Sequence, residues 1–459
     1  MTIYSEESPL KQDETYQTVV RLLNARQYTD VLKVFQNLPR ALIWASPSWM
    51  NALGVAYRGA GQPMPAVRAY LRALHLDKTN TGTWSNLGNA YKDANLIKSA
   101  IAAHKQSIVR ASVPTASQWH NYGLALSIAG LHDEAISAFE SALSIEPDQL
   151  GMRWDLARSQ LYLQNYHSGF QNYKYRWHMK DAPPRRIHGR EWDGSVLNAS
   201  TKLFVYVEQG FGDYIQCARY LSFLKERAPN LAVEVKPELR SLMEASFPEV
   251  AFIDYAETVK EIKDGLIVSL LDLPSIFLDR LCVGSVGYLT WPISGAVARL
   301  SSEKALEKNV GIVWSGSTTF KRNQYRATGP EWFVDSFSIP GVRLHSLQMG
   351  SMAKRAEKYP EEVLSRHWVS SIQNFSDTAL VLKQLDLVVT TCTSMVHLCG
   401  ALNVPCWVML DYSPHWLWGV EGDRTAWYDS VRLFRQSSPG DWRSVFDNAT
   451  AALMEWSQA

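Results

Sequence analysis

A short glycine-rich turn carries the first candidate catalytic side chain. The residues "GFGD", Gly210 to Asp213, follow an apolar run at 203–207 that predicts a buried strand, and they precede an apolar-periodic stretch that predicts a helix. The glycines allow a tight turn, and a helix begins with unpaired N–H groups. Asp213 either caps this helix or faces a cleft as a general base. Ile215 replaces the third glycine of the dinucleotide fingerprint, which disfavours a nicotinamide dinucleotide site.

A second loop has the composition of a phosphate site. The segment "WSGSTTFKRNQYRA", residues 314–327, follows the run "VGIVWS", which predicts a strand. Its small residues Ser315 and Gly316 permit close contact between the backbone and a phosphate, and Lys321 and Arg326 can neutralise the phosphate charge. The alternative interpretation is an exposed basic loop.

A third segment places a helix N-terminus after a strand. The residues "TTCTSMVHLCGALNVP", 390–405, follow the apolar run "LDLVV" and open a predicted helix. The backbone N–H groups of residues 393–396 would point at an anion, and Thr393, Ser394 and Met395 belong to that first turn. His397 lies one turn into the helix, where it could equally be a buried core histidine. The segment predicts a site for a leaving pyrophosphate.

Alternating strands and helices must position these three segments. From Leu203 onward, short apolar runs alternate with helical patterns, which argues for parallel sheets covered by helices. The predicted strands begin at Leu203, Leu231, Val250, Leu266, Val310, Val342, Leu385 and Pro405. The pattern breaks at 288–309, so we expect two Rossmann-like lobes, at 200–292 and 309–459. Ligands bind beyond the carboxyl ends of such strands, here in a cleft between the lobes.

The first third of the chain repeats. The stretches "MNALGVAY", "WSNLGNAY" and "WHNYGLAL" begin at Met50, Trp84 and Trp119, and each is followed in register by an alanine, a ring-bearing residue and a small residue. This pattern resembles the tetratricopeptide repeat. With one degenerate unit on each side, about five units predict an all-α solenoid over residues 1–176, whose concave face would dock a protein or an extended chain. A basic segment at 177–199 is interpreted as a solvated linker, or alternatively as a basic groove for a phosphate-rich acceptor.

Composition narrows the class of protein. The 459 residues contain 46 Lys and Arg against 45 Asp and Glu, so the whole chain is not driven toward nucleic acid or an acidic membrane. None of the five cysteines forms a C-x-x-C pair, which disfavours a disulfide framework or a zinc site and favours free thiols. The N-terminal residues have no apolar core, and no apolar run is long enough to span a bilayer. We therefore expect a cytoplasmic protein.

From about Trp177 to Trp456, the chain resembles the bacterial tetratricopeptide-repeat glycosyltransferases. These belong with the lipopolysaccharide heptosyltransferase group and, more distantly, with the O-linked N-acetylglucosamine transferases. The resemblance is carried by "EQGFGDYIQCARYL", "VGIVWSGS…K…R", "DTALVLKQLDLVVTTCTSMVHLCGALNVPCWVML", "SPHWLW" and "WYDSVRLFRQSSPGDW". It implies two lobes of the GT-B type, the first on the acceptor side and the second on the nucleotide-sugar side. It also implies an inverting transfer from a nucleotide-diphosphate sugar, without a metal or other cofactor.

Residue by residue, the resemblance assigns roles. The general base of the family falls on Asp213 and its phosphate-binding lysine on Lys321. The family has an aspartate where this chain has Cys392, while Thr393 and His397 remain. If that carboxylate grips the donor sugar, donor choice has changed or activity is lost. Further candidate contacts to the sugar or base are Gln209, Cys392 and Trp416.

Other functions remain open at this point. The lobes could be an inactive scaffold beside a repeat-based binding protein, or they could form an epimerase-like enzyme of the same two-lobed shape. For the transferase, the repeats would dock a macromolecular acceptor, which could be a protein, a glycan or a modified nucleic acid. The sequence names neither the donor sugar, nor the nucleotide, nor the oligomeric state.

Overall fold

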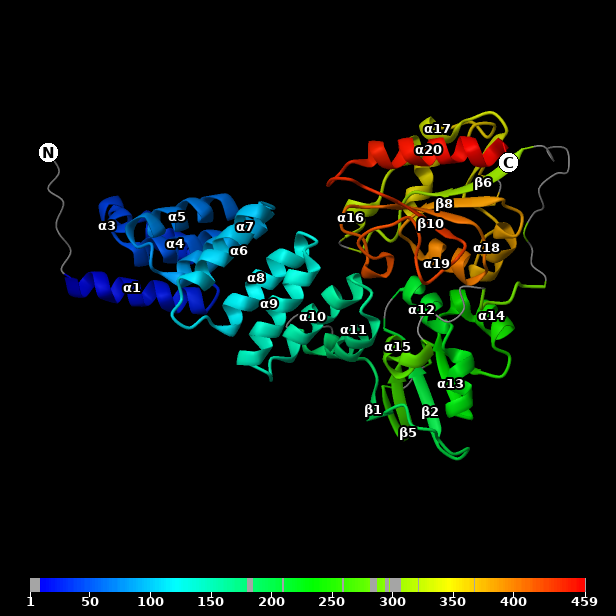
Figure 1. Ribbon diagram of the computed structural model, residues 1–459, viewed down its shortest axis with the longest axis horizontal. Coiled ribbons are helices and arrows are strands. Elements are labelled where there is room, and N and C mark those ends of the chain that lie inside the picture. Colours follow the sequence, from blue (N-terminus) through cyan, green and yellow to red (C-terminus); the bar gives the residue numbers. More distant parts are fainter. Residues whose placement is uncertain are drawn as a thin grey trace. The chain divides into compact units, whose positions relative to one another are not determined.

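The computed structural model divides the chain into two compact units, Met1–Gln160 and Leu161–Ala459, which are described separately (Figure 1). It describes residues 9–179, 185–208, 210–257, 260–280, 287–293, 297, 307–320, 322–366 and 368–458. The first unit is helical, and the second contains two parallel sheets.

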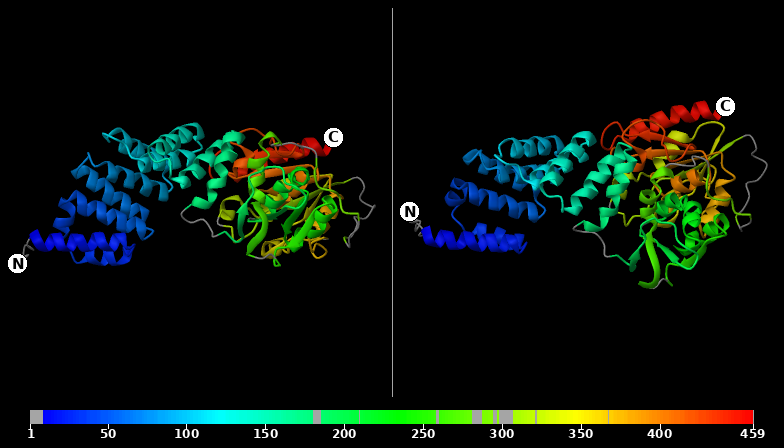
Figure 2. Two further views of the ribbon diagram at one scale, coloured as in Figure 1. Left: turned by 90° about the horizontal axis from the view of Figure 1, so that it is seen from below. Right: turned by 60° about the horizontal axis from the view of Figure 1, so that its bottom comes forward.

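Helical hairpins make up the first unit, and they stack one after another along the chain (Figure 2). The helices are α1 (Pro9–Asn24), α2 (Tyr28–Gln36), α3 (Arg40–Ala45), α4 (Pro47–Gly59), α5 (Pro63–Leu76), α6 (Thr81–Asp93), α7 (Ile97–Val109), α8 (Ala116–Ile128), α9 (His132–Ile145) and α10 (Leu150–Tyr162), the last of which continues two residues into the second unit. The predicted helical repeat is confirmed in this region.

A left-handed residue recurs in the tight turn of each hairpin. The backbone φ angle is positive at Arg26 (57°), Gly61 (75°), Asn95 (60°), Gly130 (80°) and Gln164 (60°). These positions are 34 or 35 residues apart, which is the period of a tetratricopeptide repeat. The same turn therefore joins the two helices of each unit, whether or not a glycine is present to adopt it without strain.

A glycine contact holds each of the three central hairpins together. A Cβ added at Gly88 would lie 2.6 Å from the ring of His104, and one added at Gly123 would lie 2.6 Å from the ring of Phe139. Gly54 stands in the same way against Tyr70. The missing side chain lets the ring of the second helix press against the backbone of the first, as the repeated sequence pattern predicts.

The last helix of the repeat period lies in the second unit. Helix α11 (Tyr166–Tyr173) follows the turn at Gln164. Its aromatic residues pack within the α/β unit, since Tyr166 and Phe170 contact Trp427 and Phe170 also contacts Trp416. The units therefore divide after Gln160, whereas the sequence pattern extends the repeats to residue 176.

The first sheet is parallel and has the strand order β1-β5-β2-β3-β4. Its strands are β1 (His188–Glu191), β2 (Lys202–Tyr206), β3 (Asn230–Val235), β4 (Ala251–Asp254) and β5 (Glu261–Ser269). Helices α12 (Phe211–Ala218), α13 (Leu221–Arg227), α14 (Pro237–Ser246) and α15 (Leu273–Ile276) connect or follow them. After β4 the chain returns to the other side of β2, so the switch in strand order lies between β2 and β5. Ligands of open parallel sheets bind at such a switch point.

Strand β1 comes from the segment interpreted as a solvated linker, which corrects that interpretation. β1 lies at the edge of the first sheet, and Ile187 and Trp192 on either side of it are buried. Two of its basic neighbours form ion pairs, Arg185 with Glu191 and Arg186 with the fully buried Glu234. These arginines belong to the sheet edge, which weakens the alternative of a basic groove for an acceptor.

The second sheet is also parallel, with the order β10-β9-β8-β6-β7. Its strands are β6 (Lys308–Val313), β7 (Val342–Ser346), β8 (Leu387–Thr391), β9 (Cys406–Leu410) and β10 (Val431–Arg435). Its helices include α16 (Asn323–Arg326), α17 (Pro330–Phe337), α18 (Phe375–Leu382), α19 (Ser394–Ala401) and α20 (Trp442–Gln458). The strand order switches between β6 and β8. The predicted alternation of strands and helices is confirmed, and β1 and β10 are additions to the predicted strands.

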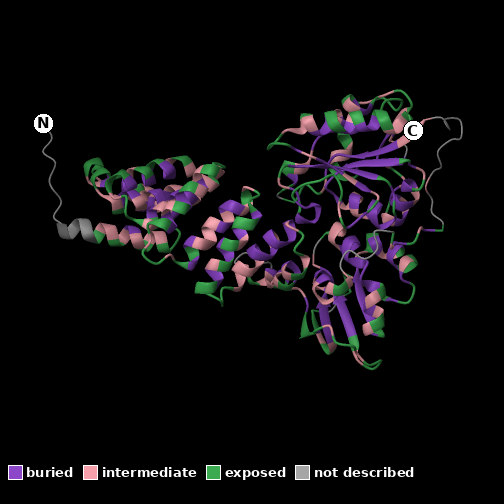
Figure 3. Ribbon diagram, viewed as in Figure 1, coloured by how far each residue is buried: buried purple, intermediate pink, exposed green. Residues whose placement is uncertain are grey.

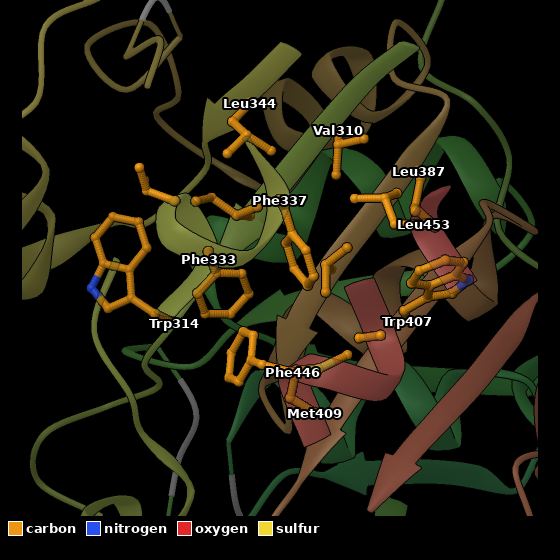
Figure 4. Close-up of a cluster of buried hydrophobic side chains, with 14 of the residues drawn as sticks. Val310, Trp314, Phe333, Phe337, Leu344, Leu387, Trp407, Met409, Phe446 and Leu453 are labelled. Carbon is orange, nitrogen blue, oxygen red and sulfur yellow. The ribbon is translucent and has the colours of Figure 1, made fainter. Parts of the chain in front are cut away.

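Both sheets are buried along their central strands (Figure 3). Every residue of β8 and β9 is buried, as expected for parallel strands that are covered on both faces. In the second sheet, Phe333 and Phe337 of α17 pack with Phe446 of α20 on one face (Figure 4). This core fixes the loops that leave the carboxyl ends of β6 and β8.

Candidate functional site

Two helix N-termini meet where the strand order of each sheet switches. Helix α12 follows β2, and helix α19 follows β8, and the two helices lie in contact (Figure 1). A Cβ at Gly212 would lie 2.8 Å from the ring of His397 and 3.6 Å from the Cα of Ser394. Only a glycine lets these two turns approach so closely. The positive ends of both helix dipoles are therefore close together, which favours an anion nearby.

Asp213 occupies the third position of α12, after the N-cap residue Gly210. Its carboxylate accepts a hydrogen bond from the backbone N–H of Gly210, the return half of a capping box. Burial raises the pKa of Asp213 to about 6, with a smaller contribution from the charge of Glu208. Backbone hydrogen bonds and the charge of Arg326 oppose that rise. A carboxylate with this pKa can exchange a proton near neutral pH.

The space beside Asp213 is small. Asp213 is half-buried and lines a cavity of about 10 Å³. The cavity is also lined by Phe170 and Tyr173 of α11, Cys217 of α12, and Trp416. That volume holds about one water molecule. The predicted contact residue Trp416 is therefore beside Asp213, but the cavity does not admit a sugar ring in this arrangement.

The loop after β6 uses its backbone donors internally. The N–H of Ser315 donates to Gln348 Oε1 at 2.9 Å, and the N–H of Gly316 donates to Asn323 Oδ1 at 3.1 Å. Asn323 and Gln348 thus accept the hydrogen bonds that were predicted to go to a phosphate. Two predicted site residues, Gln209 and Lys321, lie outside the described residues.

Of the two cations predicted for this loop, Lys321 and Arg326, the structure describes Arg326. Its side chain is half-buried, and its Nε donates to Asn323 Oδ1 at 3.3 Å. Its charge acts on Asp213, on Cys392 and on His397. The structure therefore brings Arg326 together with both helix N-termini, as a phosphate site requires.

The first turn of α19 is capped by its own side chain. Thr393 Oγ1 accepts from the N–H of Met395 at 3.2 Å, while Ser394 and Met395 remain half-buried. His397 Nδ1 is 2.9 Å from Tyr428 Oη, and its ring stacks on Trp418. Burial and neighbouring positive groups lower the pKa of His397 to about 3. His397 is therefore a neutral imidazole at pH 7, a hydrogen-bonding group rather than a charge.

Cys392 directly precedes Thr393, the N-cap residue of α19. It is buried, and its Sγ accepts a hydrogen bond from Trp418 Nε1 at 3.1 Å. Burial raises the pKa of this thiol, so it stays uncharged at neutral pH. Together with the cysteines at 217, 399 and 406 it is a free thiol. The group that Arg326 meets at this position is therefore a neutral sulfur.

Two buried arginines support the site and were missed from the sequence. Arg176 pairs with both carboxylate oxygens of Glu208, and its Nη1 donates to Asp272 Oδ1 at 2.6 Å. Glu208 lies two residues after the end of β2 and two before Gly210, so this pair anchors that turn. The partners are distant in sequence, and no local pattern links them.

The second arginine, Arg219, joins the two lobes. Its guanidinium lies between aromatic rings, with centroid distances of 5.1 Å to Trp427, 5.0 Å to Tyr428 and 4.8 Å to Tyr288. Its Nη2 donates to the carbonyl oxygen of Trp427 at 3.2 Å. The aromatic segment "WYDS" was noticed in the sequence, but nothing in the sequence indicated that Arg219 is its partner.

Comparisons with known proteins identify a repeat in the helical unit. The tetratricopeptide repeat family matches residues 116–149, the hairpin of α8 and α9. Protein FlbA of Caulobacter vibrioides is 24% identical over 436 residues, which is 88% of this chain and 72% of that protein. A match of that extent includes residues of both units.

Two other similarities each cover about a third of the chain. The anaphase-promoting complex subunit cut9 of Schizosaccharomyces pombe is 29% identical over 146 residues, covering 29% of this chain and only 21% of that protein. The crystal structure of MamA covers 37% of this chain and 94% of MamA, with 22% identity and a TM-score of 0.29. The family match at 116–149 and the stacked hairpins show that the chain contains tetratricopeptide-like repeats.

Among the described residues, no helix is long and apolar enough to cross a membrane. No group of three or more histidine, cysteine, aspartate or glutamate side chains among them has the arrangement of a metal site.

Proposed function

We propose that the α/β unit is an inverting glycosyltransferase of the GT-B type that takes its sugar from a nucleotide-diphosphate donor. The observation that carries the proposal is the position of Asp213. Its carboxyl group has a raised pKa and lies where the N-termini of α12 and α19 meet, close to Arg326. Both helices leave the carboxyl edge of a parallel sheet at a switch in strand order, the usual place for a nucleotide.

In the proposed reaction, Asp213 accepts the proton of an acceptor hydroxyl. The acceptor oxygen then bonds to the anomeric carbon of the donor sugar. The bond from that carbon to the diphosphate oxygen breaks, and the electron pair leaves with the nucleoside diphosphate. Attack opposite the leaving group inverts the anomeric centre. The positive end of α19 and Arg326 stabilise the charge on the diphosphate, so the reaction is drawn without a metal.

The small cavity sets a condition on this reaction. Because the space beside Asp213 is about 10 Å³, the aromatic side chains that line it must move to admit a donor. Phe170, Tyr173 and Trp416 are those side chains. The helical repeats would hold a macromolecular acceptor. As the resemblance implies, the first lobe would bind the acceptor and the second would bind the nucleotide. The free thiols agree with a reducing, cytoplasmic compartment.

The test uses the full-length chain and a panel of nucleotide sugars. Uridine, guanosine, cytidine and adenosine diphosphate sugars are incubated one at a time, and release of the nucleoside diphosphate is measured together with the shift in Tm. At least one donor is expected to stabilise the protein and to release its diphosphate, since a ligand of the folded state raises stability. The absence of both effects for every donor would contradict the proposal.

A second function, an inactive scaffold with binding repeats, is favoured by Cys392. The neutral thiol replaces a family carboxylate, and the amides of Ser315 and Gly316 are already paired. In this case nucleotide sugars would leave the Tm unchanged, while a protein partner would still bind the isolated helical unit with the affinity of the whole chain.

A further inference from the structure

A second hollow lies at the opposite edge of the second sheet. It has a volume of about 460 Å³, within the range of small-molecule sites. Its lining includes Pro405, Trp407 and Ser430, which lie at or beside the amino ends of β9 and β10. Asp213 faces the carboxyl edge of that sheet, so the two places are separated by the length of the strands, roughly 15 Å.

Two tryptophans supply the apolar part of this hollow. Trp407 of β9 and Trp456 of α20 both line it, with ring centroids 6.4 Å apart and planes at 67°. Trp407 is buried and packs in the core of the sheet, which holds its ring in place (Figure 4). Trp456 is half-buried, and Lys308 Nζ lies 5.3 Å from its ring centroid. The site therefore has a rigid aromatic wall.

Charges of both signs surround the tryptophans. Arg424, Asp429 and Glu455 line the hollow, are exposed, and form no ion pair with another described residue. Arg432 also lines it and is paired at the surface with Asp423 at 3.3 Å. The Oγ atom of Ser430 is buried without a hydrogen-bond partner among the described residues. The rim thus holds unused donors and unused acceptors side by side.

We propose that this hollow binds a neutral saccharide. Because Arg424 and Arg432 offset Asp429 and Glu455 around the hollow, a ligand of one charge gains little net attraction there. A neutral polyhydroxylated ring uses both kinds of group, because its hydroxyl groups donate to the carboxylates and accept from the guanidinium groups. The apolar C–H face of a sugar ring packs against an indole, which large aromatic side chains favour. The site is separate from Asp213 and does not depend on the proposed transferase activity.

The experiment measures sugar binding to the full-length chain by saturation-transfer difference NMR. The probes are the methyl glycosides of glucose, mannose and galactose, together with N-acetylglucosamine. Glucosamine and glucuronate serve as the positively and negatively charged counterparts. At least one neutral probe is expected to bind at millimolar concentration and to bind better than both charged ones. Binding is then repeated with Arg424→Ala and Glu455→Gln, two exposed positions at which folding should be retained.

Each substitution is expected to lower the affinity for the neutral sugar by about tenfold, which corresponds to the loss of one hydrogen bond to a charged group. Arg443→Ala and Glu357→Gln, exposed charges elsewhere in this lobe, are the matched controls and should leave binding unchanged. Three results would overturn the proposal. These are no binding of any neutral probe, stronger binding of a charged one, or binding that Arg326→Ala abolishes while both variants of the hollow retain it.

Discussion

Two glycines make room for a histidine ring, one in each unit of the chain. Gly88 lies against His104 in the helical unit, and Gly212 lies against His397 in the α/β unit. The first pair is 16 residues apart in a single hairpin, whereas the second is 185 residues apart and joins two lobes. Burial lowers the pKa of both rings, to about 4 for His104 and about 3 for His397.

The surroundings of the two rings differ in a way that separates packing from function. The neighbouring repeats place Tyr70 and Phe139 where His104 lies, so that position asks only for a ring. No repeat supplies an equivalent of His397, whose Nδ1 contacts Tyr428 and whose turn faces Asp213. Local, repeated contacts should therefore tolerate exchange between repeats, while the contact between the lobes should not.

The largest effect is expected from Asp213→Asn in the α/β unit. The amide keeps the size of the side chain but cannot take a proton, so turnover of a transferred sugar should fall by roughly a hundredfold. Steady-state rates and Tm are measured together, with the exposed Asp335→Asn as control. A normal rate combined with a lower Tm would mean that Asp213 only caps α12.

The pH dependence of the same group gives the second effect. With a pKa of about 6 folded and about 4 unfolded, Asp213 holds its proton more tightly in the folded state. Its contribution to the free energy of unfolding therefore falls as pH rises from about 4 to about 6, and is constant above. Turnover should rise over the upper part of that range. The free energy of unfolding is measured against pH for the wild type and for Asp213→Asn. The difference between the two curves isolates the contribution of Asp213, and a difference that does not change with pH would contradict the raised pKa.

The contact between the lobes is tested by Gly212→Ala. In an isolated helix alanine is preferred to glycine, but here the added Cβ meets the ring of His397. The free energy of unfolding is expected to fall by about 1–3 kcal/mol. In the helical unit, Gly82→Ala meets only the side-chain oxygen of Asn80 at 3.4 Å and should be neutral or stabilising. Urea unfolding measures both variants. An equal change in their free energies of unfolding would contradict the expected difference between the two glycines.

Exchange within the repeats is tested by His104→Phe, which copies Phe139. Neither ring nitrogen of His104 has a hydrogen-bond partner among the described residues, and the ring is fully buried. Phenylalanine should raise the free energy of unfolding by about 1–2 kcal/mol at pH 7. Because the pKa of His104 is about 4 folded and about 6.5 unfolded, the wild type loses stability as pH falls between those values, and the variant should lose less. If the stability of the two proteins changed equally with pH, the ring of His104 would have a hydrogen-bond partner.

The smallest effect is expected at a hairpin turn. Arg26 adopts the left-handed conformation that Gly61 and Gly130 adopt without strain. Arg26→Gly should stabilise the chain by about 0.5 kcal/mol, after the entropy gained by the unfolded chain is subtracted. The reverse change, Gly130→Ala, should cost about 1 kcal/mol. Thermal unfolding of both variants measures the pair, and a loss of stability in the first would contradict the turn geometry.

Sequence patterns predicted those parts of the fold that are local. The repeat period and the apolar runs reflect contacts within a hairpin or along a strand, and both are found in the structure. Strand β1 was missed because "HGRE" is exposed at an edge and has no apolar run. Strand β10, "VRLFR", was missed because Arg432 and Arg435 leave no apolar run longer than two residues.

The candidate site was predicted only in outline. The turns that carry Asp213 and His397 were found because each follows a strand, and strand ends of parallel sheets converge. The partners of these residues come from far along the chain, as with Arg176 and Glu208 or Arg219 and Trp427. A single sequence does not show such pairs. It also could not show that the backbone N–H groups predicted to bind a phosphate donate instead to Asn323 and Gln348.

The position of α11 bears on how this chain can change in length over evolution. A growing array of repeats needs a closing element at each end, and the final helix usually closes it with a polar face. Here α11 instead presents Tyr166 and Phe170 to Trp427 and Trp416. That aromatic contact holds α11 in one register within the α/β unit. Whole repeats can be duplicated or lost ahead of it without disturbing Asp213, so gene variants of different length should keep residues from about 150 onward unchanged.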